Sequence, residues 1–364
     1  MNKYWVGTNQ YWHDDNNWSL TSGGAGGAGI PTAIDDVFFD ANGDNLIWFT
    51  PAFECRNLTF ELSASSKFFL FEQGGIINGD FLQEAGYFGG TGGGGYVLEF
   101  KGNWQSTGGT FAIGTGTGID LTCLFSGIDK TYQLNQTGAA SYQNFSVTGS
   151  YTFSGTRLVV ANIYQKISVT GTMTIAFGKR IDLDGNDAGF DVFTGTINGD
   201  GRFRYGYRNI SVMPAAGTIS IKYWLFSLQG ALAVLNPRTY ESNCEVEIEY
   251  NSDGQIFRLG GSARHYFLGE LTILCDEASV NTAEFDCASN NAEMWIGGKF
   301  DIYKDAFPNA TFTIKFGNGM HVFRGTVDFY FSYTSLSTHL VVDAGKGTII
   351  LYPTGRQLIP LPVP

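Results

Sequence analysis

The sequence predicts an all-β chain that folds as a right-handed parallel β-helix, or β-solenoid, and three observations lead to this prediction. Glycine, phenylalanine and tyrosine are abundant, with 49, 30 and 18 copies, which is typical of many short strands joined by tight turns. No amphipathic helical pattern longer than about two turns is found. A glycine-led strand pattern also recurs in units of about 25 residues, the sequence signature of a repeat architecture.

In the repeated pattern a glycine is followed by alternating side chains, of which the second and the fourth are apolar. Gly298, for example, precedes Phe300 and Ile302. Alternate side chains of a strand point to opposite faces, so one strand cannot bury its apolar face alone, whereas stacked rungs bury it against each other. The side chains expected to point inward are Tyr151, Phe153, Met173, Ile175, Leu271, Ile273, Phe300, Ile302, Val327 and Phe329.

Three regions differ in composition. Residues 1–54 are expected to form an N-terminal capping region, which could cover one strand edge with Trp5, Trp12, Trp18 and Phe38. Residues 55–352 are expected to form the solenoid, and residues 353–364 an extended Pro-rich tail. A closed barrel or a sandwich would also use short strands. The solenoid is favoured because the repeat persists without a closing pattern while loop lengths vary freely.

The net charge of −12 argues against a protein that binds nucleic-acid backbones, which needs a basic face. No apolar run approaches the roughly 18 residues of a membrane span, and no secretory signal is recognised, so we expect no membrane insertion. The cysteines are odd in number, widely scattered and without a CxxC motif, which favours buried free thiols in a protein folded in a reducing cytoplasm. They are Cys55, Cys123, Cys244, Cys275 and Cys287.

The N-terminal stretch resembles a leader that recurs in bacteriophage virion proteins and in β-helical bacterial surface proteins. Its motif reads WVG, then NWS, PT and DDVFFD. The matching residues are Trp5, Val6, Gly7, Asn17, Trp18, Ser19, Pro31, Thr32, Asp35, Asp36, Val37, Phe38, Phe39 and Asp40. Residues 102–158 are similar to the Gly/Thr-rich repeats of the same proteins. The resemblance implies a β-helix with a structural or adhesive role, and it transfers no catalytic residues.

We therefore expect a bacteriophage virion structural protein, of the tail or host-adhesion apparatus or a head decoration, folded in the host cytoplasm. Its expected partners are other virion proteins, copies of itself (the resemblance favours a trimer) and a host surface glycan. One alternative is a β-helical tailspike-type enzyme that degrades host polysaccharide, and another is a bacterial surface adhesin.

An enzyme is not expected, because the acidic residues have a simpler explanation. Asp182, Asp184 and Asp187 surround a glycine and could hold Ca²⁺, although their order does not match an EF-hand loop. A polar turn between rungs would use the same residues. Glu245, Glu247 and Glu249 alternate along one strand and would form an outer acidic row, which serves solubility as readily as glycoside hydrolysis. No other cofactor is expected.

Two further groups are candidate contact sites. The alternation places Tyr330 outward, between inward Phe329 and Phe331, and Tyr207, Trp224 and Tyr333 lie at turns or in runs too long to bury completely. Exposed rings of this kind are what a glycan-binding or partner-binding surface requires. In the tail, Leu358, Ile359, Leu361 and Val363 alternate with prolines, a pattern that loses little entropy when it binds a groove. We expect this tail to dock on a sibling subunit or on another particle protein.

Overall fold

The computed structural model describes most of the chain, and every statement below refers to the described part. It comprises residues 1–49, 52–71, 73–90, 95–113, 121–135, 140–156, 159–183, 189–207, 216–228, 232–236, 238–261, 263–274, 282–304, 311–331, 339–343, 345–346 and 348–351. Strands dominate it, and its helical segments are two short 3₁₀ turns, η1 (Asp15–Asn17) and η2 (Leu62–Ala64). No described helix is long and apolar enough to cross a membrane.

Contacts divide the chain into two compact units. The first comprises residues 1–183 and 194–197, and the second comprises residues 184–193 and 198–364. Each is a stack of parallel strands, so the predicted parallel β-solenoid is confirmed. Strand β21 (Gly189–Phe193) belongs to the second unit, and β22 (Thr196–Tyr207) is divided between the two.

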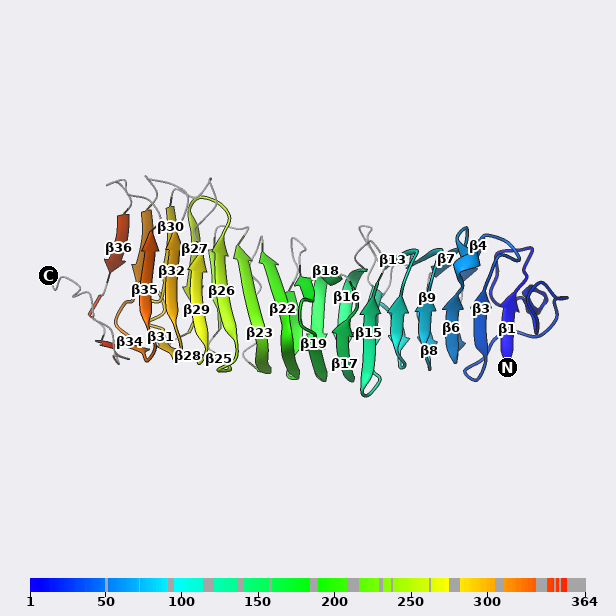
Figure 1. Cartoon of the computed structure of the whole chain (residues 1–364), viewed down its shortest axis with the longest axis horizontal. Coiled ribbons are helices and arrows are strands. Elements are labelled where there is room, and N and C mark those ends of the chain that lie inside the picture. The colour runs from blue at the N-terminus through cyan, green and yellow to red at the C-terminus, as the bar shows by residue number, and fades with distance from the viewer. Residues whose placement is uncertain are drawn as a thin grey trace. The chain divides into compact units, whose positions relative to one another are not determined.

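The first unit stacks its strands in three parallel ladders (Figure 1). The first ladder contains β1 (Asn2–Trp5), β3 (Asp36–Phe39), β6 (Asn57–Phe60), β9 (Phe81–Gln83), β12 (Trp104–Ser106), β15 (Lys130–Leu134), β17 (Ser150–Ser154) and β19 (Thr172–Ile175). The second contains β4 (Leu46–Phe49), β7 (Phe68–Phe71), β10 (Tyr87–Gly90), β13 (Thr110–Ile113) and β20 (Arg180–Leu183). The third contains β5 (Phe53–Cys55), β8 (Gly75–Ile77), β11 (Tyr96–Phe100) and β14 (Leu121–Phe125). The longer strands β16 (Ser141–Val147) and β18 (Val159–Val169) pair in both the second and the third ladder.

Columns of stacked aromatic side chains fill the interior of the first unit. Phe88 stacks between Phe69 and Phe111, with ring centroids 4.6 and 5.3 Å away and interplanar angles of 17° and 7°. Trp104 stacks on Tyr132 of the next rung at 4.2 Å. These residues meet because in-register parallel pairing places equivalent side chains directly above one another.

The leader residues build a compact aromatic cluster at the start of the first ladder. Trp5, Trp12 and Trp18 are buried, and the rings of Trp12 and Trp18 meet edge to face at 4.6 Å. The short strand β2 (Trp18–Ser19) pairs antiparallel with β1, whose other edge pairs in parallel with β3. The parallel ladder thus already includes strands before residue 55. Phe39 joins the cluster, whereas Phe38 lies on the outer face and stacks on Tyr4 at 4.9 Å.

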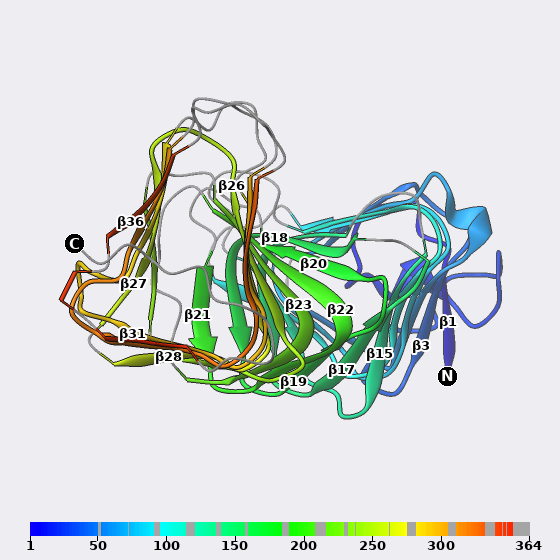
Figure 2. The ribbon, with the colours of Figure 1, turned by 60° about the vertical axis from the view of Figure 1, so that its left-hand side comes forward.

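The second unit also forms three parallel ladders. One runs through β23 (Thr218–Leu228), β26 (Glu245–Tyr250), β29 (Glu270–Leu274), β32 (Phe300–Lys304) and β35 (Val327–Phe331). Another runs from the start of β23 through β25 (Thr239–Tyr240), β28 (Arg264–Phe267), β31 (Glu293–Ile296), β34 (Met320–Phe323) and β37 (Thr348–Leu351). The last contains β24 (Leu232–Leu235), β27 (Gln255–Leu259), β30 (Thr282–Asp286), β33 (Thr311–Lys315) and β36 (His339–Asp343). Figure 2 shows β27 and β36 of this last ladder in one layer.

The predicted inward side chains are buried wherever the structure describes them fully, with one exception. Val327 is only half-buried, although it pairs in register with buried Phe300. The side chain of Phe329 lies outside the described part. The buried members are Tyr151, Phe153, Met173, Ile175, Leu271, Ile273, Phe300 and Ile302.

Four of the five cysteines are buried free thiols, as predicted, and the fifth, Cys275, lies outside the described residues. Burial raises the pKa of the Cys55 and Cys123 thiols well above the ordinary value. These thiols therefore stay protonated and behave as small core residues. The Pro-rich tail, with Leu358, Ile359, Leu361 and Val363, also lies outside the described residues.

Candidate ligand-binding groove

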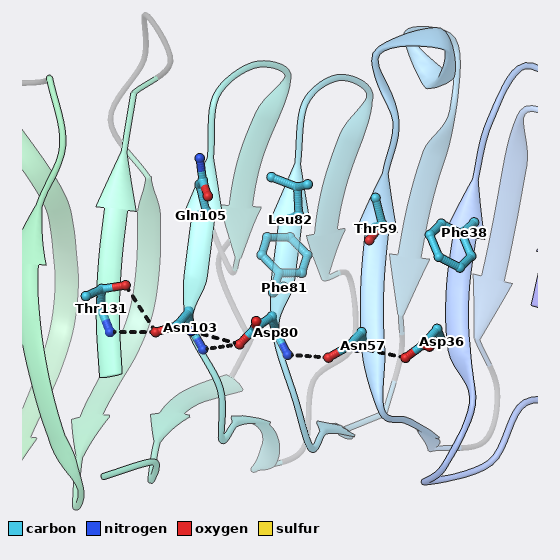
Figure 3. Close-up of a pocket in the computed structure, with 10 residues that line it drawn as sticks. All are labelled: Asp36, Phe38, Asn57, Thr59, Asp80, Phe81, Leu82, Asn103, Gln105 and Thr131. Atoms are coloured by element: carbon cyan, nitrogen blue, oxygen red, sulfur yellow. Dashed lines mark hydrogen bonds between the residues drawn. The ribbon is translucent and has the colours of Figure 1, made fainter. Parts of the chain in front are cut away.

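A groove of about 430 Å³ runs along the outer face of the first ladder in the first unit (Figure 3). Strands β3, β6, β9, β12 and β15 supply its walls, so one strand of each successive rung contributes. The lining residues are Asp36, Phe38, Asn57, Thr59, Asp80, Phe81, Leu82, Asn103, Gln105 and Thr131. Nine of them form two parallel rows with at most one residue per strand, and the tenth, Phe81, is an inward, buried residue of β9.

The first of these, the polar row, consists of Asp36, Asn57, Asp80, Asn103 and Thr131, and Figure 3 shows its side chains linked in a chain of hydrogen bonds. The Asn57 amide donates to Asp36 over 2.7 Å, and the Asn57 carbonyl oxygen accepts from the backbone N–H of Asp80 at 2.6 Å. The Asp80 carboxylate accepts from the backbone and side-chain N–H groups of Asn103, at 2.8 and 3.0 Å. The Asn103 carbonyl oxygen accepts from the backbone N–H and the hydroxyl of Thr131, both at 3.1 Å.

The polar row has a structural cause. Its members occupy the same register position, directly before or at the start of a strand of the first ladder. From Asn57 to Asn103, each side-chain oxygen accepts the backbone N–H of the residue at the same position in the next rung. Asn and Asp are suited to this position because their short side chains bond neighbouring backbone groups readily.

The second row lies two residues further along the strands and consists of Phe38, Thr59, Leu82 and Gln105, all half-buried. These residues pair in register from one rung to the next. Along the row, the apolar side chains of Phe38 and Leu82 therefore alternate with the polar side chains of Thr59 and Gln105. Within the described structure, the Thr59 hydroxyl and the Gln105 amide make no hydrogen bond to protein. Unlike the polar row, this second row therefore offers hydrogen-bonding groups to a ligand.

The charge of the groove is acidic. Two of its lining residues are aspartates, and none is Lys or Arg. The hydrogen bond from Arg56, outside the lining, holds the pKa of Asp36 below its usual value, and the Nε–Oδ1 distance is 2.7 Å. Asp80 is held by amide N–H groups. An acidic lining repels polyanions and is compatible with a neutral or cationic ligand.

The prediction that Trp224 is an exposed contact residue is wrong. Its side chain is fully buried and stacks on Phe203 at 4.6 Å. The alternation in β23 changes phase: Ile219 and Ile221 point inward, and after the corner the inward positions are Trp224, Phe226 and Leu228. Before the corner β23 pairs with β25, where Ile219 is opposite Tyr240. After it β23 pairs with β26, where Trp224 is opposite Val246. Of the other proposed contact residues, the side chains of Tyr207 and Tyr330 and the whole of Tyr333 lie outside the described part.

The proposed calcium ligands are described only in part. Asp182 is buried and forms an ion pair with Arg180, with an Nε–Oδ1 distance of 2.7 Å, whereas Asp184 and Asp187 lie outside the described residues. The carboxylate of Asp182 is thus already compensated by a guanidinium. Within the described part of the chain, no group of three or more Asp, Glu, His or Cys side chains is arranged to hold a metal ion.

The row of Glu245, Glu247 and Glu249 lies on the outer face of β26, half-buried. Burial, and then the neighbouring carboxylate of Glu270, raises the pKa of Glu245. Glu247 lies 3.8 Å from Arg202, and Glu249 accepts a hydrogen bond from the Ser227 hydroxyl at 2.8 Å. Each glutamate of the row thus interacts with a different neighbour. The row does not provide the two facing carboxylates on either side of a cleft that glycoside hydrolysis needs.

No protein-family model, curated protein or solved structure matches this chain.

Proposed function

We propose that this protein is a structural and adhesive β-solenoid that binds a linear, uncharged glycan in the groove of its first unit. The alternation of Phe38, Thr59, Leu82 and Gln105 carries the proposal. Sugar rings present C–H faces that pack on apolar side chains and hydroxyls that need hydrogen-bonding partners. A row that offers both in turn, at the strand spacing of about 4.8 Å, matches an extended chain of such rings.

The polar row fixes the geometry of this surface. Its hydrogen bonds tie each rung to the next, so that the second row is held in place before a ligand arrives. A preorganised site loses less entropy on binding than a mobile one. The acidic lining favours a neutral polysaccharide over an acidic one.

The place of this protein in a bacteriophage particle, as a multimer, is part of the same proposal and rests on the resemblance of the leader. The buried positions of Trp5, Trp18 and Phe39 support a structural use of that leader. Mass spectrometry of purified virions tests this part. Detection of the chain in stoichiometric amount supports it, and its absence from virions made by the host that expresses it contradicts it.

Binding of the full chain to a panel of neutral and acidic polysaccharides tests the groove. We expect saturable binding to a neutral polysaccharide, with affinity reduced at least tenfold by Gln105→Ala and by Leu82→Glu. The matched control is Thr272→Ala, a half-buried outer position of the second unit. Equal loss in the control, or binding unchanged in both groove variants, would refute the proposal. Release of reducing sugar by the parent protein would instead favour the tailspike-type enzyme.

A further inference from the structure

Among the described residues of the second unit, one buried cation has no carboxylate partner. Arg238 directly precedes β25, and only 6% of its surface is exposed. Its Nη2 atom donates to the carbonyl oxygens of Ala216 and Gly217, at 3.1 and 3.4 Å. Its Nε and Nη1 atoms are buried without a hydrogen-bond partner. An unpaired buried donor is destabilising, and more so when it is charged, so native structures rarely leave one unpaired.

The described surroundings of Arg238 supply no carboxylate. Its guanidinium lies over the rings of Phe193 and Tyr240, with centroid distances of 5.0 and 5.7 Å. Burial lowers the pKa of Arg238, and the neighbouring groups that act on it electrostatically are Tyr240 and Cys244, both neutral at pH 7. An arginine remains protonated in proteins, so this site keeps a full positive charge.

Tyr240 and His265 are neighbours of this cation. The Tyr240 hydroxyl is also buried without a partner. His265 stands in the next rung, since the backbone N–H of Tyr266 donates to the Arg238 carbonyl oxygen and Thr239 pairs with Tyr266. Burial lowers the pKa of His265 to about 4, so its ring is neutral near pH 7, with Nε2 2.9 Å from the Gly260 oxygen. His265 therefore adds no second positive charge.

We propose that Arg238 holds a buried monovalent inorganic anion, of the chloride class, which accepts a hydrogen bond from Nε or from Nη1. These two atoms donate at opposite edges of the planar guanidinium, so one anion binds one of them. Buried charges in proteins are normally paired, and an anion at this point pairs the charge as well as one free donor. A water molecule would satisfy the same donor but would leave the charge unpaired. The site is independent of the groove of the first unit and of the function proposed for it.

Crystals of the full chain grown in bromide test the proposal directly. We expect an anomalous peak within hydrogen-bond distance of Arg238 Nε or Nη1. In solution, replacing fluoride by chloride at constant ionic strength should raise the midpoint of thermal unfolding by about 2–4 °C in a saturable way. Arg238→Met should abolish this rise, and Arg264→Met, which removes an exposed arginine, should retain it.

A bromide crystal without a peak at Arg238 overturns the proposal, whatever the solution data show. A saturable rise that persists in Arg238→Met also overturns it, because the stabilising anion then binds elsewhere. If Arg238→Met does not fold, the bromide crystal of the parent protein decides alone.

Discussion

The two units share one architecture but join their rungs with different proportions of amide bonds and ion pairs. On the outer face of the first unit, Asn57, Asp80 and Asn103 bond the backbone of the following rung. The second unit also has such bonds, for example from the Thr282 backbone N–H to Asp253, but among its described residues ion pairs between strands are more frequent than in the first unit. Arg264 faces Glu293 across the ladder, with an Nε–Oε2 distance of 2.5 Å, and Arg258 faces Asp286 at 2.6 Å.

The interiors differ as well. The first unit stacks rings on rings, as in the file of Phe69, Phe88 and Phe111. In the second unit rings also stack in pairs, such as Tyr240 on Phe267, but aliphatic residues share the interior with buried Arg238, His265 and His321. A solenoid requires only that each rung present the same kind of group at the same register as its neighbours. Stacking rings, amides or opposite charges all meet that requirement, with different sensitivity to substitution, pH and salt.

The largest expected effect is on the free energy of unfolding, and it compares matched substitutions in the two interiors. Phe88→Ala in the first unit and Phe300→Ala in the second should each cost about 3–5 kcal/mol, from lost burial and a cavity. The leucine variants should differ, because Phe88 loses two stacked partners at about 0.5–1.5 kcal/mol each. Among the described side chains, Phe300 has only a tilted ring contact with Phe323, at 5.3 Å and 44°. Urea unfolding measures the costs, and equal losses in Phe88→Leu and Phe300→Leu would contradict the distinction.

Acid should weaken the second unit through its buried histidines. The pKa of His265 in the fold is about 4, lowered by burial from 6.5. The unfolded chain therefore binds a proton that the fold does not, so stability is full above pH 6.5 and falls by about 3 kcal/mol as pH drops to 4. His265→Met should flatten this pH dependence in part, since Met294 fills the equivalent place one rung on. Hydrogen exchange at several pH values measures the effect in the second unit, and a dependence unchanged by His265→Met would argue against it.

The polar row should contribute moderately and without salt dependence. Asn103→Ala removes the acceptor of the Thr131 backbone N–H and the link to Asp80, and it should cost about 1 kcal/mol at low and high salt alike. The neighbouring variant Gln105→Ala removes no hydrogen bond to protein and should stay within about 0.5 kcal/mol of the parent. Urea unfolding at two salt concentrations checks both. A strong salt dependence in Asn103→Ala would mean that charge, not amide bonding, joins these rungs.

The exposed ion pairs of the second unit should have the smallest effect. Arg264→Gln breaks a partly exposed pair with Glu293 and should cost about 0.2–1 kcal/mol at low salt. The difference between variant and parent should shrink towards zero in about 1 M salt, because screening weakens exposed charges. A difference that stays constant with salt would show that the packing of Arg264 over Trp295, with a centroid distance of 4.9 Å, provides the stabilisation instead.

The alternation of side chains in the sequence predicted the parallel stack and most of its inward residues, because one-face burial fixes the register of a strand. It failed at Trp224, where β23 turns a corner and its inward face changes phase. Such a corner depends on contacts with the next rung, and residues close in sequence do not reveal it.

The groove was not predicted, although the sequence holds a signal for it. Asp36, Asn57, Asp80 and Asn103 recur about one rung apart, each directly before an inward apolar residue such as Leu58 or Phe81. The glycine-led apolar repeat that predicts the solenoid does not include these polar positions. Whether such residues line a groove depends on the outward side chains two places further on, whose exposure follows only from the fold.

Hydrogen exchange of the full chain with and without a saturating neutral polysaccharide tests the central claim most directly. The account predicts added protection in peptides that cover β6, β9 and β12 of the first unit, and none in β26, β29 and β32 of the second. Protection confined to the second unit, or spread evenly over both, would contradict the assignment of the binding surface to the groove.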